Sequence, residues 1–182
     1  MKKPNTRSAC IALALLAVQP ARADVVDTAP NGFEAVEKVH VAASPDQVYA
    51  ALIQPAQWWS SQHTFSGNAA NLTLDARAGG CWCETLPGGG SVQHLVVVFA
   101  APGKMLRARG ALGPFQGAGV DGAFTWTLAA SGGGTDLTFD ASIGGYMKGG
   151  FEGIAKAADG VLGEQVQRLK QFVETGSPDK AK

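Results

Sequence analysis

The sequence predicts an α+β domain in which a curved antiparallel sheet of about seven strands wraps around a long C-terminal helix. Three observations predict it. Strand-like segments follow one another through the middle of the chain, with glycine-rich turns between them. An earlier strand leads into two short helices, and the chain ends in a long amphipathic helix.

The first strand and the two short helices are predicted from local signals. Residues 33–41 alternate largely between apolar and polar side chains, which is typical of a strand. The segment Ser44-Pro45-Asp46 then begins a helix, because it offers an N-cap, a proline at the first helical position and an acidic residue in the first turn. Gln54-Pro55 ends this helix, and a second short turn carries Trp58 and Trp59.

Six further strands are expected after a polar loop. Their turns are short and rich in glycine, so consecutive strands should pair as an antiparallel meander. The edges of such a sheet need protection, which strong curvature around a helix would provide. The expected strands span residues 71–76, 80–86, 91–101, 104–112, 120–130 and 135–144.

The final helix is predicted from about residue 151 to residue 174. Apolar residues recur there at the spacing of one helix face: Ile154, Ala158, Val161, Leu162, Val166, Leu169, Phe172 and Val173. Gly176 followed by Pro178 ends the helix. Three glycines, Gly153, Gly160 and Gly163, weaken its first half by roughly 1 kcal/mol each relative to alanine. They mark either close approach to the sheet or a ligand, or a frayed start of the helix.

The chain divides into a signal peptide (1–23), a flexible leader (24–32), the domain (33–175) and a disordered tail (176–182). The first residues are basic, residues 9–18 are apolar, and Ala21 and Ala23 form a cleavage site before Asp24. An apolar run of about ten residues is shorter than the ~20 that a membrane-spanning helix needs. We therefore expect a periplasmic or secreted protein with no stable membrane insertion after cleavage.

The charge of the mature chain argues against nucleic acid as a partner. The whole sequence has 15 basic and 15 acidic residues, and four of the basic ones lie within residues 1–23. The mature chain is therefore mildly acidic, whereas affinity for nucleic acids depends on Lys and Arg contacts to phosphates.

Three short motifs stand out in the chain: the segment VAASPDQVYAAL at residues 41–52, the Trp58-Trp59 pair, and AGGCWCE at residues 78–84. All three resemble motifs of the START/SRPBCC superfamily. The order of the predicted elements resembles the helix-grip fold of the same superfamily, which includes polyketide cyclase/dehydrase-like and chaperone-ATPase-activator-like proteins. The resemblance implies a cavity between the curved sheet and the long helix, but it leaves the activity open.

Cys81 and Cys83 are the two cysteines of the mature chain, and they share one face of their strand. A simple hairpin would bring Cys83 near His94 and Cys81 near Val96. This grouping suggests a metal site, but no fourth ligand is evident, and we expect neither a metal nor a cofactor. A disulfide is not expected either, since residues i and i+2 of an extended strand are near the upper Cα separation of about 6.8 Å. We expect two buried thiols that face the core or cavity.

Glu84 lies on the strand face opposite the cysteines and has two interpretations. It is either a carboxylate inside the cavity, with a raised pKa and an acid–base role, or a surface residue paired with Arg107 or Arg109. The second interpretation is preferred on sequence alone. Arg107 and Arg109 could otherwise orient an anionic ligand or simply be solvated. His63 lies beside a polar loop and could gate the cavity, but a solvated loop histidine is the preferred interpretation.

Binding of a small hydrophobic or amphipathic ligand, without chemistry, is the first functional hypothesis. The alternative is a cyclase/dehydrase- or hydrolase-like enzyme that uses Glu84, His94 or Tyr146, although no Ser/His/Asp or Cys/His pattern links such residues. A third, a chaperone-activating module, is weakened by export. The expected ligand-binding residues are Trp58, Trp59, Trp82, Glu84, Phe99, Trp126, Ile154, Ala158 and Leu162.

Overall fold

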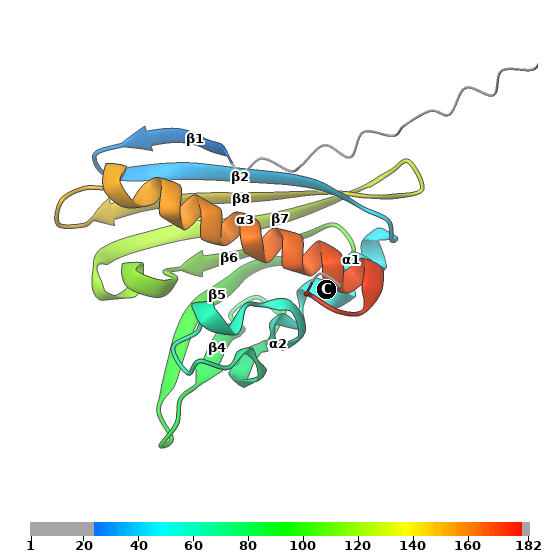
Figure 1. The fold of residues 1–182 in the computed structure, drawn as a ribbon, viewed down its shortest axis with the longest axis horizontal. Helices are drawn as coiled ribbons and strands as arrows, with labels where there is room; N and C mark the ends of the chain where they lie inside the picture. Colours follow the sequence, from blue (N-terminus) through cyan, green and yellow to red (C-terminus); the bar gives the residue numbers. More distant parts are fainter. Residues whose placement is uncertain (1–23, 180–182) are drawn as a thin grey trace, which may run out of the picture.

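The computed structural model describes residues 24–179 and has the α+β architecture that the sequence predicts (Figure 1). One antiparallel sheet has the strand order β1-β2-β8-β7-β6-β5-β4-β3. The strands are β1 (Asp24–Ala29), β2 (Gly32–Val41), β3 (Leu72–Leu74), β4 (Cys81–Thr85), β5 (Ser91–Ala101), β6 (Met105–Gly110), β7 (Gly119–Ser131) and β8 (Gly134–Tyr146).

The helices cover one face of this sheet. Figure 1 shows α3 (Glu152–Thr175) lying along the sheet, with α1 (Pro45–Leu52) beside its C-terminal end. The remaining helical segments are short: α2 (Pro55–Trp58), η1 (Ser61–His63), η2 (Ala69–Asn71) and η3 (Gly113–Gly117). Within residues 24–179, no helix is long and apolar enough to cross a membrane.

The predicted signals at the helix ends are confirmed. The Ser44 hydroxyl accepts a hydrogen bond from the Gln47 N–H, and the Gln47 side chain accepts one from the Ser44 N–H, so α1 begins with a capping box. Gly176 ends α3 in the left-handed conformation, with φ of 78°. An added Cβ at Gly153 or Gly160 would meet no atom within 4 Å, so close packing does not explain these two glycines.

The expected flexible leader is wrong over most of its length. Residues 24–29 form β1, which pairs with β2 and raises the number of strands to eight. The pairing shifts register between Val25 and Asp27, and this irregularity breaks the alternation by which a strand is recognised in the sequence.

The two ends of the chain lie partly outside the described residues. The expected signal peptide, residues 1–23, lies wholly outside them and stays a prediction. Of the expected tail, residues 176–179 form neither helix nor strand, but the Asp179 carboxylate pairs with Arg168 of α3 at 2.7 Å. Residues 180–182 lie outside the described part.

Candidate functional site

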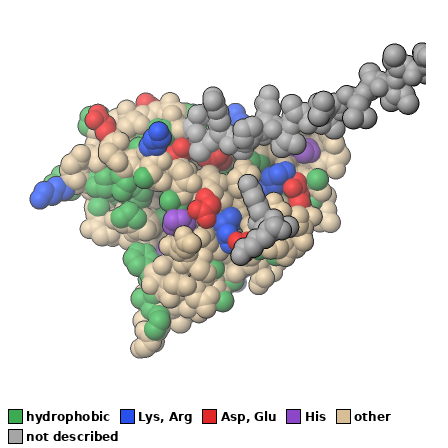
Figure 2. Space-filling view, in the orientation of Figure 1, with side chains coloured by type: hydrophobic (Ala, Val, Ile, Leu, Met, Phe, Trp, Pro, Cys, Tyr) green, Lys and Arg blue, Asp and Glu red, His purple; other side chains and the backbone are tan. Residues whose placement is uncertain are grey.

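A cavity of about 460 Å³ lies between the first half of α3 and the sheet. Its side walls are the loop Gln62–Phe65 and the turn Leu112–Phe115, and Figure 2 shows hydrophobic side chains on this face between the start of α3 and η3. The lining residues are Trp59, Gln62, His63, Thr64, Phe65, Leu72, Trp82, His94, Leu112, Gly113, Pro114, Phe115, Phe124, Ile143, Ile154, Ala157, Ala158, Val161 and Leu162.

The size of the side chains on α3 explains why the cavity lies at this end. The first half of the helix lines the cavity with Ile154, Ala157, Ala158, Val161 and Leu162, and the two alanines among them fill less space than larger side chains would. In the second half, Val166 and Leu169 are buried against the sheet and the aromatic residues of the core. One helix therefore covers a cavity with its first half and closes a packed core with its second.

A cluster of tryptophans separates the cavity from that packed core. The rings of Trp59 and Trp82 are 5.3 Å apart between centroids, and Trp82 stacks on Trp126 at 5.8 Å. Trp58 contacts both Trp59 and Trp82 from the side of α2. The cluster thus forms a rigid aromatic end wall for the cavity.

Five of the nine expected ligand-binding residues line the cavity: Trp59, Trp82, Ile154, Ala158 and Leu162. Trp58 and Trp126 lie behind this wall, in the packed core. Glu84 is buried and does not line the cavity, but it lies within hydrogen-bond distance of His94, which does.

Phe99 does not line the cavity. It is 47% exposed, because β5 carries an extra residue between Val97 and Phe99 relative to β6. This bulge reverses the alternation of the strand and turns Phe99 outward.

A second bulge in β5 brings a histidine into the site. Trp82 pairs with Leu95 while Cys83 pairs with Gln93, so His94 is the extra residue. As a result, two consecutive residues, His94 and Leu95, are both buried. Leu95 joins the core, and His94 faces both the cavity and Glu84.

The interpretation of Glu84 as a surface residue is wrong. Its side chain is buried, at 1% exposure, and one carboxylate oxygen lies 2.9 Å from Nε2 of His94. The same carboxylate accepts hydrogen bonds from the backbone N–H groups of Phe65 and Ser66. Glu84, a residue of β4, therefore binds the loop with Phe65 and Ser66 and holds this wall of the cavity against the sheet.

The cavity interpretation of Glu84, with a raised pKa, is wrong in the direction of the shift. Burial alone would raise the pKa of Glu84, but hydrogen bonds from Ser66, from the Phe65 N–H and from His94 outweigh burial and hold the pKa below its ordinary value of 4.5. Glu84 is therefore ionised at neutral pH.

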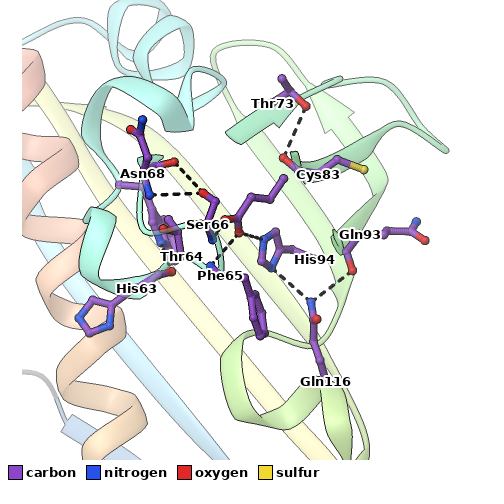
Figure 3. A network of polar contacts seen from close by, with 12 residues as sticks. His63, Thr64, Phe65, Ser66, Asn68, Thr73, Cys83, Gln93, His94 and Gln116 are labelled. Atoms are coloured by element: carbon purple, nitrogen blue, oxygen red, sulfur yellow. Dashed lines mark hydrogen bonds and ion pairs between the residues drawn. The ribbon is translucent and has the colours of Figure 1, made fainter. Parts of the chain in front are cut away.

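Gln116 of η3 completes the network on the other side of His94 (Figure 3). Its Nε2 lies 3.2 Å from Nδ1 of His94 and donates to the backbone carbonyl of Gln93 at 3.3 Å. A carbonyl oxygen can only accept a hydrogen bond, so the Gln116 side chain must turn its NH2 group toward the Gln93 carbonyl. Nδ1 of His94 then accepts from Gln116, and Nε2–H donates to Glu84.

The loop at the cavity mouth is also tied to α3. The Trp59 Nε1–H donates to the His63 carbonyl at 2.9 Å, and Nε2 of His63 lies 3.2 Å from the carboxylate of Glu164. Deeper in, the Ser60 N–H donates to the Gln165 side chain at 2.8 Å. His63 thus lies at the mouth, as the gating idea requires, and bridges the loop to the helix.

The expectation of two free cysteines inside the core is wrong. Cys81 and Cys83 form a disulfide on the half-exposed outer face of β4. Their Cα atoms are 5.4 Å apart, less than a regular extended strand allows, at the point where the β4–β5 pairing shifts register. Cys81 lies opposite Val96, as the simple hairpin has it, but Cys83 lies opposite Gln93 instead of His94.

Several other candidate residues lie away from the cavity. Arg107 donates to Thr125, Arg109 pairs with Asp121, and both arginines are exposed. Tyr146 is 77% exposed at the end of β8. Within residues 24–179, no three His, Cys, Asp or Glu side chains gather closely enough to hold a metal ion.

Sequence reasoning did not identify Gln116 as part of the site, and it did not connect Phe65, an aromatic residue of the core or pocket rim, with His94. The Phe65 ring stacks on His94 with centroids 5.9 Å apart, and Gln116 lies in a turn that joins β6 to β7. Neither residue carries a local signal. A pair of residues from two loops can be assigned to one histidine only after the topology has brought the loops together.

Comparison of the chain with known proteins agrees with this fold. EF2215 from Enterococcus faecalis, a conserved protein of unknown function, is 18% identical, with 89% of this chain and 82% of that chain covered and a TM-score of 0.60. CalU16 from Micromonospora echinospora is 17% identical, with 89% and 78% covered and a TM-score of 0.56. DynU16, a protein of the dynemicin biosynthetic locus, is 23% identical, with 80% and 49% covered and a TM-score of 0.56.

These identities support a shared fold and no more. No curated protein matches the chain. A family model described as "Polyketide cyclase / dehydrase and lipid transport" matches residues 33–174, most of the sequence. This match confirms the resemblance to the START/SRPBCC superfamily, and the chain belongs to the polyketide cyclase/dehydrase and lipid transport family.

Proposed function

We propose that the mature chain is exported and binds a small, mostly apolar molecule in the cavity under the first half of α3. The observation that carries this proposal is the cavity itself. Its volume of about 460 Å³ lies within the range of small-molecule sites, and apolar side chains make most of its lining. The family description includes lipid transport, which is consistent with an apolar ligand.

Filling the cavity tests the proposal. The neutral fluorescent probe N-phenyl-1-naphthylamine should bind the mature protein, and Ala158→Trp should weaken its binding at least tenfold, because the indole would occupy the space. Lys156→Trp is the matched control, since Lys156 lies on the exposed face of the same helix. Unchanged affinity in Ala158→Trp, with both variants folded, would place the probe elsewhere and contradict the proposal.

The export part of the proposal has its own test. Expression of the full chain in a bacterium with a periplasm should yield a protein whose first residue is Asp24, measured by intact mass. Native mass spectrometry of the same sample should show a co-purifying organic ligand, which is lost in Ala158→Trp. An uncut chain that stays in the cytoplasm would contradict export.

The hydrogen-bonded pair of Glu84 and His94 favours a second candidate, an enzyme with cyclase/dehydrase-like acid–base chemistry. A buried carboxylate that orients a histidine is a common arrangement for proton transfer. The other titratable side chain that lines the described cavity is His63, however, and it lies in the loop at the mouth and not beside His94. We therefore favour binding. Loss of one water from the co-purified ligand on incubation, absent in His94→Phe, would favour the enzyme.

A further inference from the structure

The polar groups of the cavity are unevenly distributed. Gln62, His63 and Thr64 lie in the loop at the mouth, whereas His94 is the polar side chain that the sheet contributes to the lining of the described cavity. His94 is 6% exposed and stacks on Phe65, so its ring is fixed in place. A ligand with an apolar body would meet a polar partner at this one end.

The surroundings of His94 determine which polar group suits it. Nε2–H is committed to the ionised carboxylate of Glu84 at 2.9 Å, and the Gln116 amide faces Nδ1, so Nδ1 is an acceptor. A ligand group at Nδ1 must therefore donate a hydrogen bond. A hydroxyl does this, while an ether or ketone oxygen does not.

Charge excludes a second class of ligand. No Lys or Arg is among the described residues that line the cavity, and Glu84 already places a negative charge behind His94. An ionised carboxylate has no hydrogen to donate to Nδ1, and it would bring a second negative charge into a largely apolar space. Burying a charge without a partner is costly.

Gln116 has room to leave His94. Its side chain is half-buried and lines a shallow groove on the other side of His94, with Arg109 and Ala111. Gln116 does not line the main cavity. Rotation toward the groove would free Nδ1, and the amide could bond to water there instead.

We propose, on the basis of the binding function above, that the ligand is a neutral apolar molecule with an alcohol or phenol hydroxyl at one end. This hydroxyl donates to Nδ1 of His94 in place of Gln116. Apolar carboxylates such as fatty acids, and the corresponding ethers, bind more weakly. The cavity thus selects by hydrogen-bond direction and by charge as well as by shape.

Three probes with one skeleton test this selectivity: 2-naphthol, 2-methoxynaphthalene and 2-naphthoate. Binding is measured at neutral pH by the change in tryptophan fluorescence, because Trp59 and Trp82 line the cavity. We expect 2-naphthol to bind at least tenfold more tightly than either of the other two. Equal binding of 2-naphthol and 2-methoxynaphthalene, or tighter binding of 2-naphthoate, would overturn the inference and leave the binding function standing.

Two variants assign the selectivity to His94. His94→Phe should abolish the advantage of 2-naphthol and retain binding of 2-methoxynaphthalene. Gln116→Leu should tighten 2-naphthol severalfold and leave 2-methoxynaphthalene unchanged, because it removes the competing donor. If His94→Phe fails to fold, the test rests on Gln116→Leu. An equal change in the affinities for 2-naphthol and 2-methoxynaphthalene in that variant would overturn the inference. Failure of all three probes and of N-phenyl-1-naphthylamine to bind would instead count against the binding function.

Discussion

The two halves of α3 cover the same sheet with opposite results. The second half buries Val166 and Leu169 against the aromatic core, and the packing there leaves little space. The first half presents Ala157 and Ala158 over Phe124 and Ile143, and a cavity of about 460 Å³ remains. The amphipathic stripe is continuous through both halves, so side-chain volume, and not hydrophobic pattern, separates core from binding site.

This difference assigns different roles to similar residues. Side chains in the second half stabilise the fold because close packing surrounds them. Side chains at the cavity already face empty space, and their removal costs little packing. Glu84 and His94 lie at the boundary and connect the two regions to the loop at the mouth. Four sets of variants test this difference between the packed region and the cavity.

Truncation in the packed half should have the largest effect. Leu169→Ala is expected to lower the free energy of unfolding by about 2–5 kcal/mol, because Leu169 is fully buried. Ile154→Ala, at the wall of the cavity, should cost less than half as much. Urea unfolding followed by circular dichroism measures both. Equal losses would mean that the cavity end is as tightly packed as the core.

Glu84→Gln should come next, with a loss of about 1–3 kcal/mol, the cost of leaving buried groups without partners. Glutamine has nearly the same shape as glutamate. Its NH2 group is a hydrogen-bond donor, however, and would point at one of the N–H donors of Phe65, Ser66 or His94.

The loss caused by Glu84→Gln should depend on pH. Because the pKa of Glu84 is lowered from 4.5 in the folded protein, its contribution is complete above that value and disappears as pH falls through the lowered pKa. Stability curves of wild type and variant should therefore converge in acid. A constant difference at every pH would contradict the ionised state, and Glu152→Gln, at an exposed carboxylate of α3, is the control.

Replacement of both cysteines by serine should have a smaller effect. The disulfide closes a very short loop, for which the chain-entropy relation gives about 1.5 kcal/mol. The disulfide is on the outer face of β4, whereas Trp82 and Glu84 point inward. The double variant should thus lose stability without losing affinity for N-phenyl-1-naphthylamine. A large loss of affinity would show that the two faces of β4 are coupled.

Gly160→Ala should have the smallest effect and the opposite sign. Gly160 is exposed in the middle of α3, and an added Cβ meets no atom within 4 Å. The gain in free energy of unfolding should be about 1 kcal/mol, with unchanged probe affinity. Destabilisation, or weaker probe binding, would indicate that Gly160 is required for close approach of α3 to the sheet or to a ligand.

Prediction from sequence succeeded where a signal is local and periodic. The capping box at Ser44, the stripe that contains Leu162, Val166 and Leu169, and the end of α3 at Gly176 are all confirmed. The architecture followed from these elements together with the family motifs.

The errors have a common physical cause, which is irregular strand pairing. A register shift hid β1, another lies beside the unexpected disulfide between Cys81 and Cys83, and a third turned Phe99 outward. The burial of Glu84 could not be predicted, because its partners Phe65 and Ser66 come from a loop that folds back onto the sheet. Periodicity assumes unbroken alternation, and each bulge breaks it.

The bulge at His94 also has an evolutionary consequence. Leu95 is needed in the core and His94 in the cavity, yet an unbroken strand would direct only one of two neighbours inward. Deletion of this one residue would restore the alternation of β5 and remove the polar side chain that the sheet contributes to the cavity. A polar ligand preference could therefore be acquired or lost through a change in strand length, without a substitution at any other position of the pocket.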